Sequence, residues 1–248
     1  MLPQPFPHTV IDDFARPDLL EQVLAEVTAG DKDGALWNTI DDRFQRKSAC
    51  ANMRQMGPAT RQLISFMNSR EILGWLEKLT GIQGLIADWQ LAGGGIHALR
   101  TDGYLNVHAD FSLHRHLKLD QRINLLLYLN KDWKEEYGGA VELWNTDMTA
   151  CQERIVPLFN RCAIFNTTDK SFHGNPVPVA APDGRTRLSL AFYYSTNGRP
   201  EEEQGDAHWT LFRHRPGEET AKGRARTLFK KLTPPIITEW LDKRRNEG

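Results

Sequence analysis

The strongest constraint on the fold is a series of eight short β-rich runs, which turn-forming residues separate, between positions 85 and 195. Short strands at this spacing are typical of β-sandwiches and jelly rolls. We therefore expect a mainly β core. The runs are LIADWQLA (85–92), YLNVHADF (104–111), RINLLLYL (122–129), AVELWNT (140–146), RIVPLF (154–159), RCAIFNT (161–167), HGNPVPV (173–179) and RTRLSLAFYYS (185–195).

The segment before this core has helical patterns. Pro58 suits the first turn of one helix, and Ser69 and Gly81 suit the two ends of the next. The stretch from Gly30 to Met56 is polar and predicts irregular structure. Apolar residues recur at helical spacing in three places, so the predicted helices are 16–27, 58–67 and 70–79.

A charged extension follows the core. It is acidic at Glu201–Glu203 and basic from Lys222 to Lys231, which is typical of a solvated surface. Residues 233–245 have the pattern of a capped helix. A chain of 248 residues with 40% hydrophobic content can bury one substantial core. We expect a single domain over 1–248, with helical support (1–84), the β core (85–197) and the extension (198–248).

Composition excludes several classes of function. A formal net charge of −1 provides no overall field for nucleic acid or a membrane surface, so neither is an expected partner. Three cysteines, with no CxxC pair, argue against a disulfide framework and for a reducing compartment. No run approaches the length of a membrane-spanning helix. We expect a cytoplasmic protein; its oligomeric state is left open.

A metal site is indicated by His108 and Asp110. Side chains two positions apart in a strand project to the same face, so this pair can chelate. His173, in "SFHGNP", is the natural third ligand. Two imidazoles and one carboxylate form the facial triad of non-haem Fe(II) oxygenases, which leaves open coordination positions. His114 and His116 also share a face, but no nearby carboxylate joins them and their segment has the character of a loop.

An arginine after the distal histidine suits a carboxylate ligand, because its planar fork makes two hydrogen bonds to that group. In "RTRLSLAFYYS", Arg187 lies on the polar face, and the bulky opposite face is expected to pack against helices. Arg185 is two positions away and would project to the same face, so the alternation of side chains does not show which of the two arginines binds the carboxylate. The turn beside Arg185 favours its exposure to solvent. Tyr128, on another strand, could give a hydroxyl to the same carboxylate.

From Trp89 to Thr196 the chain resembles the 2-oxoglutarate/Fe(II)-dependent dioxygenase superfamily, and within it the prolyl-4-hydroxylase-like branch. The HxD pair, the distal histidine and the following arginine carry the resemblance together. "YLNKDW" (128–133), followed by Gly138–Gly139 and "ELW", is similar to the corresponding strand, turn and strand of the oxygen-sensing prolyl hydroxylases. "NTTDKSFHGNPVPV" (166–179) resembles the distal-histidine segment of that branch.

The resemblance implies a double-stranded β-helix, a jelly-roll variant, packed against N-terminal helices. It implies that His108, Asp110 and His173 hold Fe(II), and that Arg187 and Tyr128 hold the far carboxylate of 2-oxoglutarate. Tyr104 lies near the position of a cofactor-contacting tyrosine. The co-substrates implied are 2-oxoglutarate and O2, with ascorbate as a reductant. Since Asp110 supplies the carboxylate ligand, a halogenating relative is not expected.

The reaction implied is oxidative decarboxylation of 2-oxoglutarate coupled to hydroxylation of a C–H bond, with a prolyl residue of a protein or peptide as the favoured substrate. Two departures weaken this choice of substrate. The turn at 180–184 lengthens the interval between histidine and arginine, and the link 111–121 is short. The alternatives are a hydroxylase of a free amino acid or other small metabolite, and a non-catalytic jelly-roll module that binds metal. Nucleic-acid demethylation would need a basic groove, which the net charge does not favour.

Overall fold

The computed structural model describes residues 4–31, 36–114, 116–203 and 208–212. The chain divides into two compact units, Met1–Phe212 and Arg213–Gly248. The second unit, including the helix predicted at 233–245, lies outside the described residues. The fold is therefore that of the first unit.

Three α-helices precede most of the sheet, as predicted: α1 (Pro17–Asp31), α2 (Pro58–Met67) and α3 (Arg70–Thr80). Ser69 caps α3, and Gly81 ends it in the left-handed conformation with φ of 76°. Pro58 opens α2, but its preceding Gly57 has no side chain to cap the helix. The carboxylate of Glu26 in α1 takes that role and accepts hydrogen bonds from the α2 backbone.

Thirteen strands are described. They are β1 (His8–Ile11), β2 (Asn38–Asp41), β3 (Gln45–Cys50), β4 (Ile86–Ala87), β5 (Gly95–Leu99), β6 (Tyr104–Ala109), β7 (Asp120–Tyr128), β8 (Val141–Trp144), β9 (Cys151–Ile155), β10 (Cys162–Asn166), β11 (His173–Asn175), β12 (Arg187–Thr196) and β13 (Leu211–Phe212). Short 3-10 turns lie between them: η1 (Met53–Gln55), η2 (Glu135–Tyr137), η3 (Pro182–Gly184) and η4 (Glu201–Glu203).

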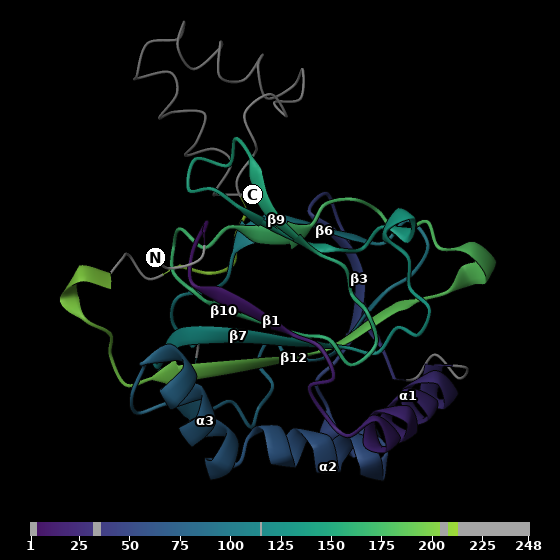
Figure 1. Ribbon diagram of the computed structural model, residues 1–248, viewed down its shortest axis with the longest axis horizontal. Helices are drawn as coiled ribbons and strands as arrows, with labels where there is room; N and C mark the ends of the chain where they lie inside the picture. The colour runs from purple at the N-terminus through teal and green to yellow at the C-terminus, as the bar shows by residue number, and fades with distance from the viewer. Residues whose placement is uncertain (1–3, 32–35, 115, 204–207, 213–248) are drawn as a thin grey trace, which may run out of the picture. The chain divides into compact units, whose positions relative to one another are not determined.

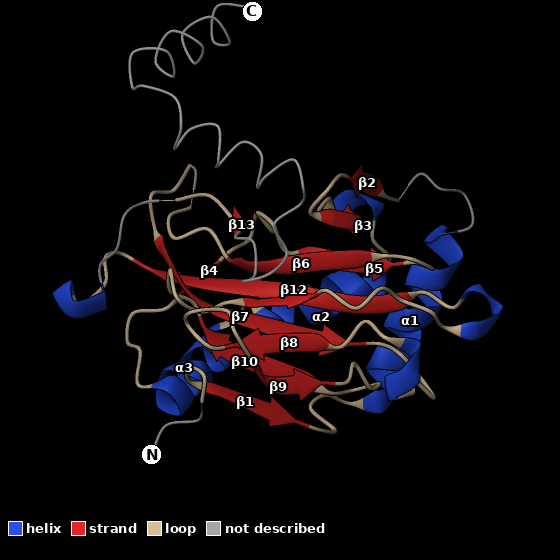
Figure 2. Ribbon diagram, turned by 90° about the horizontal axis from the view of Figure 1, so that it is seen from above, coloured by secondary structure: helices blue, strands red, loops and turns tan. Residues whose placement is uncertain are grey.

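Ten of the strands follow one antiparallel path, in the order β1-β10-β7-β12-β5-β3-β6-β11-β8-β9, and β2, β4 and β13 pair with β3, β12 and β6 beside it. The β1-to-β5 part forms one layer, the β6-to-β9 part lies over it and β3 connects the two, so the path folds back on itself as a double-stranded β-helix (Figures 1 and 2). This confirms the fold class. The long pairing of β7 with β12 runs through the centre of the first layer.

Alternation along β12 sends its residues to two different environments. Leu188, Leu190, Phe192 and Tyr194 are buried in the same apolar cluster as residues of α1, α2 and α3. The helices cover this outer face of the layer (Figure 1). Residues of the opposite parity face the space between the layers. The face of β12 predicted to pack against helices is therefore confirmed.

Three predictions of local structure need correction. Gly30–Met56 is not irregular, because β2 and β3 form a hairpin there and β3 joins both β5 and β6. The run 85–92 forms only the short strand Ile86–Ala87, since Asp88 turns the chain by accepting bonds from two backbone N–H groups. The run 154–159 becomes a strand at Cys151–Ile155, earlier than predicted; Pro157, which follows, cannot donate to a ladder.

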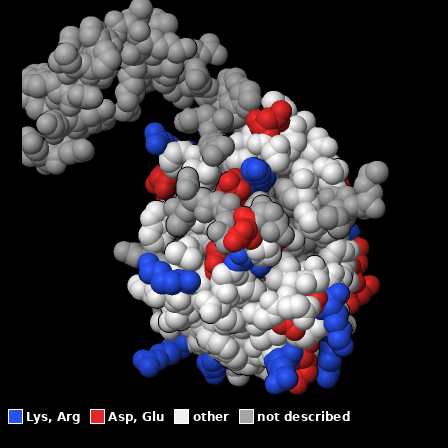
Figure 3. Space-filling model, turned by 90° about the vertical axis from the view of Figure 1, so that its left-hand side faces the viewer, with Lys and Arg blue, Asp and Glu red and all other residues white. Residues whose placement is uncertain are grey.

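Lysines and arginines are interspersed with aspartates and glutamates on the face shown in Figure 3. The described residues visible there form no continuous basic stripe. No helix in the described part of the chain is long and apolar enough to cross a membrane.

Candidate metal and co-substrate site

His108, Asp110 and His173 converge because of how two neighbouring strands pair. His108 in β6 and His173 in β11 are direct partners in an antiparallel register, which sets their side chains beside each other. Their ring centroids are 4.5 Å apart. Asp110 directly follows β6. Its carboxylate lies 3.5 Å from Nε2 of His108 and 3.7 Å from Nε2 of His173.

Both imidazoles present the same nitrogen to the site. Nδ1 of His108 lies 2.8 Å from the carbonyl oxygen of Asn106, and Nδ1 of His173 lies 2.9 Å from that of Ser171. A carbonyl only accepts, so Nδ1 carries the proton in each ring and donates. Each Nε2 therefore keeps its lone pair and faces the other two groups, which is the tautomer that a metal requires.

The Asp110 carboxylate is oriented by two amide side chains. Its Oδ2 accepts hydrogen bonds from Nε2 of Gln121 at 3.0 Å and from Nδ2 of Asn124 at 2.9 Å. Both donors lie on β7, in the layer opposite β6. These bonds fix the carboxylate and leave Oδ1 available to a metal.

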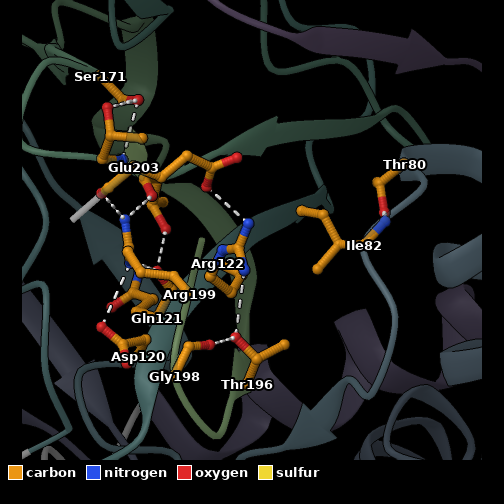
Figure 4. A network of polar contacts seen from close by, with 12 residues as sticks. Thr80, Ile82, Asp120, Gln121, Arg122, Ser171, Thr196, Gly198, Arg199 and Glu203 are labelled. Atoms are coloured by element: carbon orange, nitrogen blue, oxygen red, sulfur yellow. Dashed lines mark hydrogen bonds and ion pairs between the residues drawn. The ribbon is translucent and has the colours of Figure 1, made fainter. Parts of the chain in front are cut away.

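Gln121 is itself held by the polar network shown in Figure 4. The guanidinium of Arg199 donates to the Gln121 backbone carbonyl at 2.5 Å. Beside it, Arg122 donates to the Glu203 carboxylate at 2.6 Å. The segment after β12 is thereby tied to the start of β7, which supports the group that orients Asp110.

Burial keeps the site in the protonation state that suits metal binding. The two histidines and Asp110 are each at most 5% exposed. Burial lowers the pKa of His173 to about 4, so its ring is neutral at physiological pH. Burial by itself would raise the pKa of Asp110, but the two histidines and Asn124 outweigh this and hold the pKa below its usual value.

The three groups line a cavity of about 250 Å³ between the two layers. Its inner wall is formed by β7 and β12, through Asn124, Leu126, Arg187, Ser189 and Tyr193. Its outer wall is formed by β2, β3 and β13, through Ile40, Gln45, Lys47 and Phe212, together with Thr210 just before β13. Outer-wall residues are all at least partly exposed, whereas most of the inner wall is buried.

Arg187 lines this cavity and is 3% exposed. Its Nη1 donates to Oγ of Ser189 at 2.8 Å, and its Nε donates to the carbonyl of Gly139 at 3.2 Å, which fixes the guanidinium. Tyr128 lies against it, with the guanidinium carbon 4.9 Å from the ring centroid. Arg185 is exposed and lies outside the cavity lining, so the structure separates the two arginines that alternation could not.

The remaining candidates lie elsewhere. Tyr104 is not among the cavity-lining residues, and its hydroxyl donates to the carbonyl of Asp42 at 2.9 Å. His114 is buried with Nε2 3.8 Å from Asp88, and its Nδ1 accepts from two backbone N–H groups. His116 is exposed. The structure does not bring these residues to the metal-ligand group.

Sequence reasoning missed Lys47 and His97, which also line the cavity. Both lie on strands that were not predicted, β3 and β5. Burial, Lys47 and Arg187 together lower the pKa of His97 to about 3, so His97 is neutral. The "GIHAL" run, which follows two glycines, carries a weak strand signal at His97. Nothing in the local sequence marks Lys47.

The residues present fit a metal ion and a dicarboxylate. His108, Asp110 and His173 are the one group of three such donors in the described part of the chain whose ligand atoms lie within 4.8 Å of one another. Two imidazole nitrogens and a carboxylate suit Fe(II). The Tyr128 hydroxyl has no hydrogen-bond partner among the described residues; Tyr128 is not itself a cavity-lining residue, but it lies beside the buried guanidinium of Arg187, which is one. A carboxylate is the group that would satisfy both.

Comparisons with known proteins agree with this geometry. Residues 94–195 match the family model of the 2OG-Fe(II) oxygenase superfamily. The chain is 27% identical to prolyl 3-hydroxylase OGFOD1 of Mus musculus, over 79% of this chain. It spans only 34% of the length of that relative.

Solved structures share the fold. A prolyl-4-hydroxylase of Pseudomonas putida has a TM-score of 0.57 at 16% identity, covering 77% of this chain and 94% of that one. HygX of Streptomyces hygroscopicus, with nickel, 2-oxoglutarate and hygromycin B bound, has a TM-score of 0.53 at 14% identity, covering 83% and 92%. Residues 94–195 of this chain are thus similar to the 2OG-Fe(II) oxygenase superfamily, and the fold is the double-stranded β-helix found in the prolyl-4-hydroxylase structure.

Proposed function

We propose that the chain uses Fe(II), 2-oxoglutarate and O2 to hydroxylate a C–H bond, and that its substrate is a prolyl residue of a protein or peptide. One observation carries the proposal. A facial set of two histidines and an aspartate shares a cavity with a buried arginine. The similarity to a prolyl 3-hydroxylase supports the prolyl substrate.

A ferrous ion together with 2-oxoglutarate supplies the oxidising chemistry, in which O2 is consumed, succinate and CO2 are released and one oxygen atom enters the C–H bond. His108, His173 and Asp110 would hold the ion from one side. Gln121 and Asn124 keep the Asp110 carboxylate oriented, so that no reorganisation is needed when the ion binds.

Arg187 and Tyr128 would hold the far carboxylate of 2-oxoglutarate. Burial raises the pKa of Tyr128 to about 12, so its hydroxyl stays protonated and can donate. Leu126 and Val141 contribute apolar surface to the same cavity, which helps to exclude water from the bound co-substrate.

The experiment is an anaerobic titration with Fe(II) followed by 2-oxoglutarate, in which a visible charge-transfer band is monitored, and then succinate is measured after exposure to air. We expect the band and succinate release. A non-catalytic module that binds metal would give neither band nor succinate, and that result would refute the enzyme assignment. Formation of hydroxyproline within a prolyl peptide tests the substrate.

A small-molecule substrate is the second candidate. HygX shares the fold and was solved with hygromycin B bound. The cavity is also lined by Lys47, a cation that is not needed to bind the proposed metal and co-substrate. We expect the reaction to take place in the reducing cytoplasm.

A further inference from the structure

Lys47 lies in the cavity but outside the groups that would hold iron and 2-oxoglutarate. It is on β3, and its neighbours on the outer wall are Gln45 and Ile40, the latter its direct partner in the β2–β3 hairpin. Lys47 is partly exposed, whereas Arg187 is 3% exposed. Lys47 is therefore more accessible to solvent, as a residue, than Arg187.

The ammonium of Lys47 makes no hydrogen bond or ion pair with the described residues. The charged groups that act on its pKa are Asp110, Arg187 and Asp42. Asp42 is exposed, and its Oδ1 accepts from two backbone N–H groups in the hairpin turn. Burial lowers the pKa of Lys47, so the folded protein bears a cost for holding this charge without a partner.

With iron and 2-oxoglutarate bound, the other charges of the cavity would cancel one another, and the positive charge of Lys47 would remain. A ferrous ion and the dianion 2-oxoglutarate neutralise each other, and Arg187 offsets Asp110. His97 is neutral. Lys47 thus remains as the surplus positive charge of the cavity, where a low dielectric makes a partner anion valuable.

We propose that Lys47 binds a carboxylate of the substrate that becomes hydroxylated. This inference rests on the proposed function and narrows it to substrates that bear an anionic group near the reacting carbon. The carboxylate has two possible sources, the α-carboxylate of a free amino acid and an acidic side chain beside the reacting residue of a peptide.

The test measures binding of matched probes to the anaerobic Fe(II)–2-oxoglutarate form by isothermal titration calorimetry. One pair is L-proline and L-prolinamide. The other pair is two capped peptides that differ only in Glu-Pro against Gln-Pro. The wild-type protein is expected to bind the carboxylate member of one pair roughly ten- to hundredfold more tightly, the usual range for a charge-assisted hydrogen bond. The pair that shows the preference identifies the source.

Variants connect the preference to Lys47. Lys47→Met keeps the length of the side chain and removes the charge, so the preference is expected to disappear while binding of the neutral probes is unchanged. Lys47→Arg is expected to keep most of it. Lys131→Met is the matched control, because Lys131 forms an exposed ion pair with Glu21 outside the cavity. Melting temperatures verify that each variant folds.

Two results would overturn the assignment. In the first, wild-type protein binds carboxylate and neutral probes equally or binds none of them. In the second, Lys47→Met lowers the affinity for 2-oxoglutarate more than tenfold, which would make Lys47 a co-substrate ligand. Failure of the proposed function is distinguishable, since wild-type protein would then show neither the 2-oxoglutarate band nor succinate release.

Discussion

The inner and outer walls of the cavity are built from different kinds of strand. The inner wall belongs to β7 and β12, nine and ten residues long, which pair with each other over most of their length. The outer wall belongs to β2, β3 and β13, of four, six and two residues, and none of their pairings is as long as that of β7 with β12. The inner-wall strands contribute many residues to the hydrophobic core, whereas β2 and β13 lie off the main strand order and only β3 lies within it.

This difference assigns separate tasks to the two walls. A side chain on a long central strand is held by packing on its other face, which suits groups that must bind the same metal and co-substrate in every turnover. Short strands with short pairings are held by fewer contacts and can vary with less effect on the core. We expect chemistry to depend on the inner wall and on the β6–β11 pair, and substrate choice to depend on the outer wall.

The largest effect is expected from loss of a metal ligand. His173→Ala removes one of the three converging donors and should lower both Fe(II) affinity and succinate formation by at least about a hundredfold, more than the loss of a group that only orients a ligand. Equilibrium dialysis and succinate assays measure the two effects. His116→Ala is the control, because His116 is exposed. If the two variants are equally active, the metal does not bind at the β6–β11 pair.

The next effect concerns the co-substrate anchor. Arg187→Met should weaken 2-oxoglutarate binding roughly ten- to hundredfold, since a buried charge-assisted pair is lost, while Fe(II) affinity stays nearly constant. Arg185→Met, at an exposed position of the same strand parity, should change neither. Titration of the visible band gives both constants. If Arg185→Met weakens 2-oxoglutarate binding and Arg187→Met does not, the co-substrate is held by Arg185, beside the η3 turn, and not by Arg187 on the inner wall.

A smaller effect is expected at Asn124, on the inner wall. Asn124→Ala deletes one of two amides that orient the Asp110 carboxylate and should reduce Fe(II) affinity about tenfold. Asn145→Ala, in the β8–β9 turn, is the control, because its side chain bonds only to turn residues. If both variants bind Fe(II) like wild type, the orientation of Asp110 does not depend on Asn124, and Gln121 is sufficient for it.

The smallest effect should come from the outer wall itself. Phe212 of β13 stacks on Phe44 with ring centroids 4.6 Å apart. Phe212→Ala should lower the free energy of unfolding by about 1 kcal/mol, with 2-oxoglutarate affinity unchanged within about twofold. Chemical denaturation and the band titration test this. A large loss of co-substrate affinity would show that the two walls do not act separately.

The sequence predicts the inner wall well because apolar and polar residues alternate over the whole length of a long strand. In β12 the apolar and polar faces can be read directly, and Arg187 appears on the face that the structure places in the cavity. The HxD spacing works in the same way at the end of β6. These signals are local, since residues two apart share a face whatever the rest of the chain does.

The outer wall could not be predicted because tertiary pairing creates it. β3 has the sequence QRKSAC, whose strand conformation depends on β5 and β6 on either side. Lys47 lines the cavity only because this pairing directs its side chain there. The strand β13 likewise forms through its pairing with β6 beside His108. The residues that we assign to substrate choice are therefore those with the weakest sequence signal.

The most direct measurement is anomalous diffraction from crystals grown anaerobically with Fe(II) and 2-oxoglutarate. We predict one iron peak within bonding distance of Nε2 of His108, Nε2 of His173 and a carboxylate oxygen of Asp110, with the far carboxylate of 2-oxoglutarate on Arg187. An iron peak at any other group of side chains, or 2-oxoglutarate bound away from Arg187, would contradict the account.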